Sequence, residues 1–351
     1  MPLFLCTPRS SDQALSLFLG LTIPLFQVSI VALRAGEIEV VQASMLGSIL
    51  SNLLLVLGMC FLLGGIVNMR DPNGRGIEQT FASGTAQTTC SMMTLASASL
   101  IIPAALYNVL NHSDSQEKQA SILVLSRGTA VILLVLYCAY LFFVLRTHKE
   151  LFEPEAQAVG AVGDVETHHS DPEEDPILSP WSAALVLIAT TVIISYAADY
   201  MVDSIDDIAA SGAISKTFIG LILIPIVGNA AEHVTACVVA VKNKMDLAMG
   251  VAIGSSIQIA LLVTPSLVLL GWAIGQPMSL HFETFETIAF ALSVMVVTYT
   301  VQDGKSNYLE GAMVSYPVTK GGWRQREKML TKVITKTAYG SLHHHRACLL
   351  G

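Results

Sequence analysis

The sequence predicts an all-α polytopic membrane protein with about eight transmembrane helices. Hydrophobic residues make up 53% of the 351 residues and charged residues only 13%, and the mean hydropathy is +0.61. Soluble domains carry about 25% charged residues, so this composition excludes a soluble enzyme. A second observation is that each half of the chain contains a similar small-residue motif, which indicates an internal repeat.

Eight apolar segments are long enough to span a bilayer, because about 20 residues cross its hydrocarbon core. They lie near residues 14–33, 41–67, 81–107, 121–145, 180–199, 214–241, 247–275 and 285–302. The one long connection is acidic and contains proline, which predicts a water-exposed linker. We therefore expect five parts: a divergent N-terminus (1–27), a first repeat (28–146), the acidic linker (147–179), a second repeat (180–313) and a divergent basic tail (314–351).

The charges of the loops predict an orientation. One set of loops carries most of the basic residues: Arg70, Arg75, Arg146, Lys149, Lys242, Lys244 and Lys305. The opposite loops carry Arg34 and Lys118, and the loop at 200–213 is acidic. Because basic loops stay in the cytosol, the first set and the acidic linker are expected to be cytosolic. The net charge of −8, with many of the acids in one stretch, argues against nucleic-acid binding.

The internal repeat aligns residues 40–52 with residues 247–259. Each stretch has a Gly-Ser pair in the middle of a predicted helix, Gly47-Ser48 in the first and Gly254-Ser255 in the second. Small residues let helix backbones approach closely, and their hydroxyls can bond across helices. Helix packing alone would explain one such stretch. The paired occurrence beside a buried acid favours a transporter with its site between the repeats.

The buried acid is Glu232, which lies within the apolar segment 214–241. Pro225 and Gly228 precede it, so we expect the helix to bend or break just before the acid. A charged group in hydrocarbon costs a few kcal/mol or more, and such residues usually belong to functional sites. The alternative is an acid near a helix end whose carboxylate reaches water.

A carboxylate at this depth can bind either a hard cation or a proton. Ca²⁺ prefers about six to eight oxygen ligands, which mix carboxylates, carbonyls and water. The candidate ligands are Glu232, Asn229, the backbone carbonyl freed at Gly228, and the polar side chains of Ser48, Ser51, Ser255 and Gln258. Burial favours the neutral acid when no metal is bound, so an entering cation would expel the proton. His233 could relay protons or serve packing alone.

The cysteines do not indicate a soft-metal site. Cys60, Cys90, Cys138 and Cys237 lie within apolar segments, and no C-x-x-C pattern occurs among all six. They are interpreted as small packing residues rather than as a disulfide or zinc framework.

Three stretches of the second half are similar to a known family. Residues 228–233 (Gly-Asn-Ala-Ala-Glu-His), with 242–248 and 254–258, resemble the second signature repeat of the Ca²⁺/H⁺ antiporters in the cation/Ca²⁺ exchanger superfamily. Residues 28–53 look like the rest of the first repeat, and residues 303–311 also match. The resemblance covers Val28 to Met313.

This resemblance implies an inverted-repeat exchanger fold and alternating access, with Ca²⁺ moved into an acidic vacuolar lumen against returning protons. Ca²⁺ and H⁺ would be the transported ions, with no cofactor, in an integral protein of the vacuolar membrane. Glu232 matches the exchange carboxylate, and the supporting polar positions match Asn229, Ser48, Ser51, Ser255 and Gln258. The sequence is also compatible with a homo-oligomer in the lipid bilayer.

The chain departs from the family pattern in its first repeat. The family carries a second Gly-Asn-Ala-x-Glu motif, whose acid falls at Leu25 when Gly47 is aligned with Gly254. Residues 21–25 lack the motif, and Gln27 is the only nearby polar side chain. Fewer helices than usual are predicted, so truncation at both ends is expected. The alternative is a non-transporting truncated or regulatory membrane protein. A receptor-like bundle would explain neither the repeat nor the acid.

Overall fold

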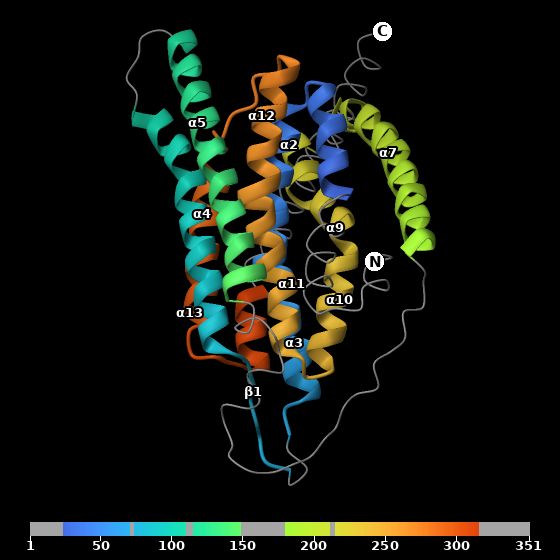
Figure 1. Cartoon of the computed structure of the whole chain (residues 1–351), viewed down its shortest axis with the longest axis vertical. Helices are drawn as coiled ribbons and strands as arrows, with labels where there is room; N and C mark the ends of the chain where they lie inside the picture. Colours follow the sequence, from blue (N-terminus) through green and yellow to red (C-terminus); the bar gives the residue numbers. More distant parts are fainter. Residues whose placement is uncertain (1–23, 71–73, 110–114, 149–179, 211–214, 316–351) are drawn as a thin grey trace, which may run out of the picture.

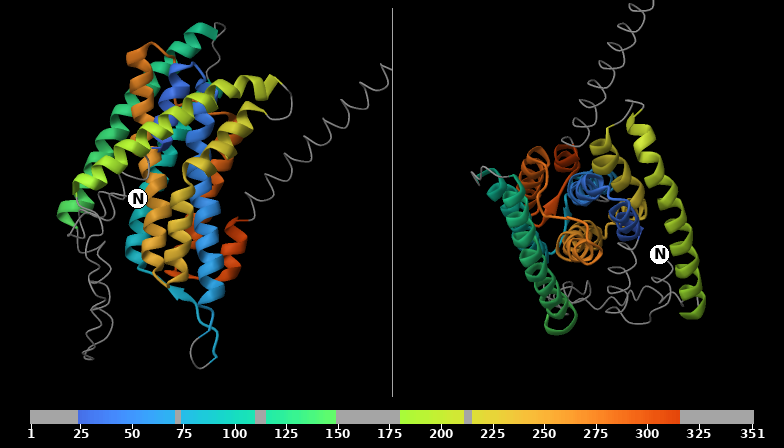
Figure 2. Two further views of the ribbon diagram at one scale, coloured as in Figure 1. Left: turned by 90° about the vertical axis from the view of Figure 1, so that its right-hand side faces the viewer. Right: turned by 90° about the horizontal axis from the view of Figure 1, so that it is seen from above.

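The protein is a bundle of long helices in a computed structural model that describes residues 24–70, 74–109, 115–148, 180–210 and 215–315. Most helices run along one common direction (Figure 1). Two further views show α7 (Pro180–Ala210) lying obliquely along one side, and α4 (Ser83–Val109) and α5 (Ser115–Phe142) along the opposite side (Figure 2). The all-α prediction is confirmed for the described part of the chain.

The first repeat begins with a helix over Pro24–Arg34. A tight turn leads into α2 (Ile38–Leu50), which continues through the π-helical turn η2 (Ser51–Val56) into α3 (Leu57–Val67). The helices α4 and α5 follow, and the π-helical turn η3 (Phe143–Thr147) extends α5.

In the second repeat, α7 is followed by a broken helix. Its elements are α8 (Lys216–Phe218), η5 (Ile219–Leu223), α9 (Ile224–Gly228), α10 (Ala230–Val241), α11 (Met245–Gln258), η6 (Ile259–Val263), α12 (Thr264–Ile274), α13 (Thr284–Thr300) and a helix over 308–315. A short antiparallel pair, β1 (Gln79–Thr80) with β2 (Lys305–Ser306), joins the two repeats.

Four helices of the described residues are long and apolar enough to cross a membrane: Ile38–Val67, Ser83–Tyr107, Glu117–Thr147 and Met245–Ile274. A bent pair, Lys216–Gly228 with Ala230–Val241, forms a fifth candidate span. The shorter apolar helices Pro24–Arg34 and Thr284–Thr300 overlap the predicted segments 14–33 and 285–302. The count of eight spans therefore stays a prediction. The predictions for the extreme N-terminus, most of the linker and the basic tail lie outside the described residues.

The two repeats share the backbone pattern that the sequence alignment predicts. In the first turn, the N–H groups of Ala35, Gly36 and Glu37 donate to the carbonyls of Val31, Leu33 and Ala32; in the second, those of Lys242, Asn243 and Lys244 donate to Val238, Ala240 and Val239. The left-handed position is Gly36 (φ 85°) in one turn and Asn243 (φ 59°) in the other, two residue types that tolerate it. The following helices run in opposite directions in Figure 1, so the repeats are inverted.

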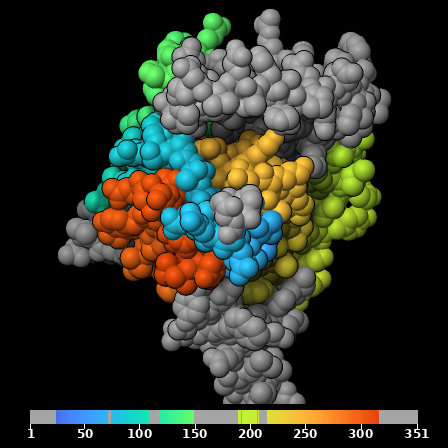
Figure 3. All heavy atoms as spheres, turned by 90° about the horizontal axis from the view of Figure 1, so that it is seen from below, coloured from blue at the N-terminus to red at the C-terminus, as the bar shows by residue number. Residues whose placement is uncertain are grey.

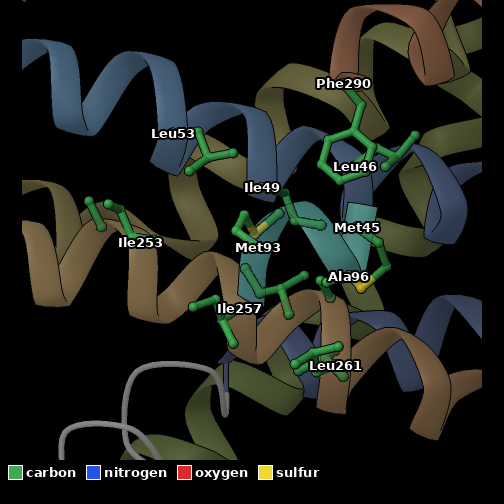
Figure 4. Close-up of a cluster of buried hydrophobic side chains, with 14 of the residues drawn as sticks. Met45, Leu46, Ile49, Leu53, Met93, Ala96, Ile253, Ile257, Leu261 and Phe290 are labelled. Carbon is green, nitrogen blue, oxygen red and sulfur yellow. The ribbon is translucent and has the colours of Figure 1, made fainter. Parts of the chain in front are cut away.

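Small residues in α2 allow close contact with the second repeat. A Cβ on Gly47 would overlap the backbone carbonyl of Leu221, and a Cβ on Gly220 would lie 2.9 Å from the Cβ of Ala43. The small-residue stretch is therefore the contact surface between α2 and η5. Around it, buried apolar side chains from both repeats form the core shown in Figure 4, which includes Met45, Ile49, Leu53, Met93, Ile253, Ile257 and Leu261.

The basic loops gather at one end of the bundle. The Nε2 atom of Gln79 donates to the Ala240 carbonyl (3.1 Å) and to Asn243 Oδ1 (2.8 Å), and the β1–β2 pair holds Lys305 beside them. Segments from both halves of the chain meet on this face (Figure 3). Arg75, Lys242, Lys244 and Lys305 thus share one side, as the loop charges predict. Its assignment to the cytosol stays a prediction.

Candidate functional site

The helix breaks immediately before Glu232. The helix α9 ends at Gly228, α10 begins at Ala230, and the two spans meet at an angle of 55°. Asn229 lies between them with φ −106° and ψ 16°. The predicted break is therefore confirmed. It places Glu232 in the first turn of α10, where free N–H groups and the helix dipole favour a negative charge.

Both polar residues at the break are buried. Glu232 is 2% exposed and Asn229 is 1% exposed. Glu232 Oε1 and Asn229 Nδ2 have no hydrogen-bond partner among the described residues. Leaving a buried polar atom unpaired costs about 1–3 kcal/mol, so these atoms are suited to receive a ligand. The alternative in which Glu232 reaches water from a helix end is wrong for this fold.

Two polar contacts connect the repeats next to Glu232. The hydroxyl of Ser51 lies 3.3 Å from His233 Nε2, and Asn52 Nδ2 donates to Ser255 Oγ at 3.1 Å. Ser51 and Asn52 are the first two residues of η2, where the wider π-helical turn interrupts the span. His233 therefore has a polar contact as well as a packing role.

The other predicted ligands lie on elements that adjoin α10. Ser48 on α2 and Gln258 at the end of α11 are buried, and Ser48 Oγ and Asn52 Oδ1 have no partner among the described residues. The helix α10 packs against α3, α11 and η2. Asn52 is absent from the predicted ligand set. The repeat alignment pairs Asn52 with the apolar Ile259 and therefore does not mark it as a ligand. Its position next to the predicted ligand Ser51 was the only sequence feature that could have identified it.

Leu25 lies beside the helix break. Its side chain is fully buried, and its Cδ1 atom would be 3.8 Å from a Cβ on Gly228. The nearby Gln27 has a buried Oε1 atom without a partner among the described residues. An apolar side chain thus stands at the position where the alignment places the family's first acid. Within the described ranges, no three or more His, Cys, Asp or Glu residues group closely enough to hold a metal ion.

Comparison with known proteins identifies the family. Residues 19–146 and 182–315 match the family described as sodium/calcium exchanger protein. The chain belongs to this family. It is 45% identical over 287 residues to the vacuolar calcium ion transporter of Schizosaccharomyces pombe. The alignment covers 82% of this chain and 65% of that protein. It is 38% identical over 288 residues to the Ca²⁺/H⁺ antiporter of Aphanothece halophytica, with 82% of this chain and 74% of that protein covered.

The fold agrees with this membership. The structure of native YfkE superposes with a TM-score of 0.68 and 31% identity, covering 88% of this chain and 82% of that one. The exchanger fold and the membrane location predicted from the sequence are thus confirmed. The chain spans just under two thirds of the length of the S. pombe relative. These relatives are named as a calcium ion transporter and a Ca²⁺/H⁺ antiporter.

Proposed function

We propose that this chain carries a Ca²⁺/H⁺ exchange site in which the two ions compete for the carboxylate of Glu232. The observation that carries the proposal is a buried acid with an unpaired oxygen on a broken helix between inverted repeats. The relatives named as a vacuolar calcium ion transporter and a Ca²⁺/H⁺ antiporter support it.

The chemistry follows from burial. Without a metal, a proton neutralises Glu232 because a charged carboxylate is poorly solvated in the bundle. Ca²⁺ replaces that proton and gains oxygen ligands from the Gly228 carbonyl and from the side chains of Asn229, Ser48, Ser51, Ser255 and Gln258. Ca²⁺ is the substrate, and alternating access of the two repeats exposes it to either side. We place the protein in the vacuolar membrane, with the basic loops and the acidic linker in the cytosol.

Leu25 sets a limit on this exchange. One carboxylate balances only half of the charge of Ca²⁺, and neutral oxygens compensate the remainder poorly in a medium of low dielectric constant. We therefore propose that Leu25 weakens Ca²⁺ binding relative to a site with two acids. The second candidate function, a non-transporting regulatory membrane protein, is favoured by the same observation.

Uptake of radiolabelled Ca²⁺ into vesicles under a proton gradient tests the proposal. The unmodified chain, Glu232→Gln and Leu25→Glu are compared at equal incorporation. We expect uptake by the unmodified chain, none by Glu232→Gln and more by Leu25→Glu. Uptake by Leu25→Glu alone would support the non-transporting alternative. Equal uptake with Glu232→Gln would exclude Glu232 as the exchange carboxylate.

A further inference from the structure

A second buried acid lies outside this site, in the first turn of α13. The connection between α12 and α13, residues 275–283, enters the bundle: Met278, Leu280 and Phe282 are buried. In Figure 1 this connection leaves the end of α12 and descends toward α5 before α13 begins. Gln42 Nε2 donates to the Ser279 carbonyl (2.8 Å), and the N–H of Leu280 donates to Ser126 Oγ (2.9 Å). The helix α13 therefore starts within the protein.

This start buries Glu286, which is only 3% exposed. Among the described residues, no hydrogen bond or ion pair involves the carboxyl group of Glu286. The ion pairs between described residues lie elsewhere, at Lys216–Glu37 and Lys305–Glu78. Burial without a partner disfavours the charged carboxylate, so this position favours the neutral acid.

Among the described elements, α4, α2 and η2 pack most closely against α13, and these three supply no positive charge. The titratable side chains of α4 are Cys90 and Tyr107, η2 has none, and the one charged residue of α2, Glu39, is exposed. Burial and its surroundings therefore keep Glu286 neutral unless a proton acceptor approaches.

Titratable groups also lie on the connection that precedes α13 and at its surface end. Glu283 is exposed, lies three residues earlier and interacts electrostatically with Glu286. The half-buried ring of His281 lies 4.0 Å from the Tyr107 ring, centroid to centroid, and Lys118 Nζ lies 4.0 Å from the same ring. An exposed carboxyl group that exchanges protons with solvent thus lies three residues before Glu286.

The buried face of α13 also leads toward the candidate exchange site. Glu286, Phe290, Ser293 and Val297 are buried at helical spacing on one face. The helix packs against η2, which carries Ser51 and Asn52. Glu286 and Glu232 therefore both belong to elements that contact η2.

We infer that Glu286 is a second proton-carrying group, which accepts protons at the α12–α13 face and passes them toward Glu232 as Ca²⁺ leaves. This inference rests on the proposed function. In the transfer, the O–H bond of Glu286 breaks, a new O–H bond forms at Glu232 through the polar groups and water around η2, and Glu283 or water returns a proton to Glu286. Only protons move, and Glu286 binds no Ca²⁺.

Two transport modes separate this role from a structural one. We expect Glu286→Gln to slow proton-driven Ca²⁺ uptake about tenfold or more, while Ca²⁺/Ca²⁺ self-exchange stays within about twofold, because only the first mode needs proton transfer. Glu286→Asp should recover part of the rate, and Glu283→Gln, which removes the proposed exposed proton donor, should shift the pH dependence of the uptake rate. An equal loss in both modes, or no loss, would overturn the inference.

A measurement on the purified protein separates this inference from the proposed function. Infrared difference spectra against pH detect the C=O stretch of protonated carboxylic acids. Glu286→Gln should remove one buried-acid band that is insensitive to Ca²⁺, and Glu232→Gln should remove a band that Ca²⁺ abolishes. Loss of no band in Glu286→Gln overturns the inference even if Glu232 behaves as proposed. Persistence of the Ca²⁺-sensitive band in Glu232→Gln overturns the proposed function alone.

Discussion

In both repeats a helix ends in a tight turn, and a longer helix then returns through a π-helical turn near its middle. The turns make the same three hydrogen bonds, and η2 and η6 interrupt the returning spans at nearly aligned positions. The side chains at the aligned acid position differ: Glu232 in the second repeat and Leu25 in the first. Both are buried beside the same helix break.

This difference shows that the backbone of the site does not require the charge. The inverted framework depends on apolar packing and on small residues at contacts such as Gly47 with Leu221. An apolar residue can therefore replace an acid without disturbing the framework, while the charge available to a cation halves. Fold and ion binding are separable in this chain, and the following changes test that separation.

The largest effect is expected for Glu232→Gln. The substitution keeps the size of the side chain and removes the charge, so Ca²⁺ should no longer stabilise the protein. Saturating Ca²⁺ at about 100 times its Kd stabilises a folded protein by about 3 kcal/mol, and we expect all of that to be lost. Thermal unfolding with and without Ca²⁺ measures it, and the shift in the unmodified chain should shrink at low pH as protons compete. If Ca²⁺ raised the unfolding temperature of Glu232→Gln as much as that of the unmodified chain, Glu232 would not be the residue that distinguishes the second repeat in Ca²⁺ binding.

A smaller effect is expected for Gly47→Ala, which tests the shared framework. Its new methyl group would overlap the Leu221 carbonyl, so the helices must separate at a cost of about 2 kcal/mol. Gly250→Ala on α11 is the matched control, because a Cβ there meets no atom within 4 Å. The control should gain about 0.5–1 kcal/mol from helix propensity. Denaturation in detergent compares the two, and equal stabilities would argue against close contact as the reason for the small residue.

Leu25→Glu should give the first repeat an acid at the position that Glu232 occupies in the second repeat. A second acid beside the break is expected to tighten Ca²⁺ binding about tenfold, which is about 1.4 kcal/mol. It should also lower stability in the absence of Ca²⁺, because a buried carboxyl group would replace a buried apolar side chain. Calorimetric titration measures the affinity, and Leu25→Gln is the neutral control. Equal affinities of the two variants would show that charge at this position does not contribute to binding.

The smallest effect is expected for Ser51→Ala. It removes the 3.3 Å contact with His233 and should cost about 1 kcal/mol or less, since a hydrogen bond contributes little net stability. Because Ser51 is also a candidate ligand, Ca²⁺ affinity should fall slightly as well. Ser44→Ala is the control, since Ser44 on α2 bonds only within its own helix, to the Val41 carbonyl. An effect of Ser51→Ala as large as that of Glu232→Gln would contradict a supporting role.

The sequence by itself determined the membrane class, the register of the repeats and the break before Glu232. These depend on local properties: apolar length, the missing N–H of Pro225, and the weak helix propensity of Gly228. A repeated pattern also fixes which residues are equivalent, so Leu25 could be identified as the position of the first acid without coordinates.

Only the tertiary structure decided which polar groups meet. The Asn52–Ser255 bond and the Ser51–His233 contact depend on how helices from different repeats pack, which no local pattern encodes. The burial of Glu286 has the same origin. The sequence places it at the start of an apolar segment, where a helix end at the surface would expose it. The inward course of residues 275–283 buries it instead, because contacts with Gln42 and Ser126 hold that connection inside the bundle.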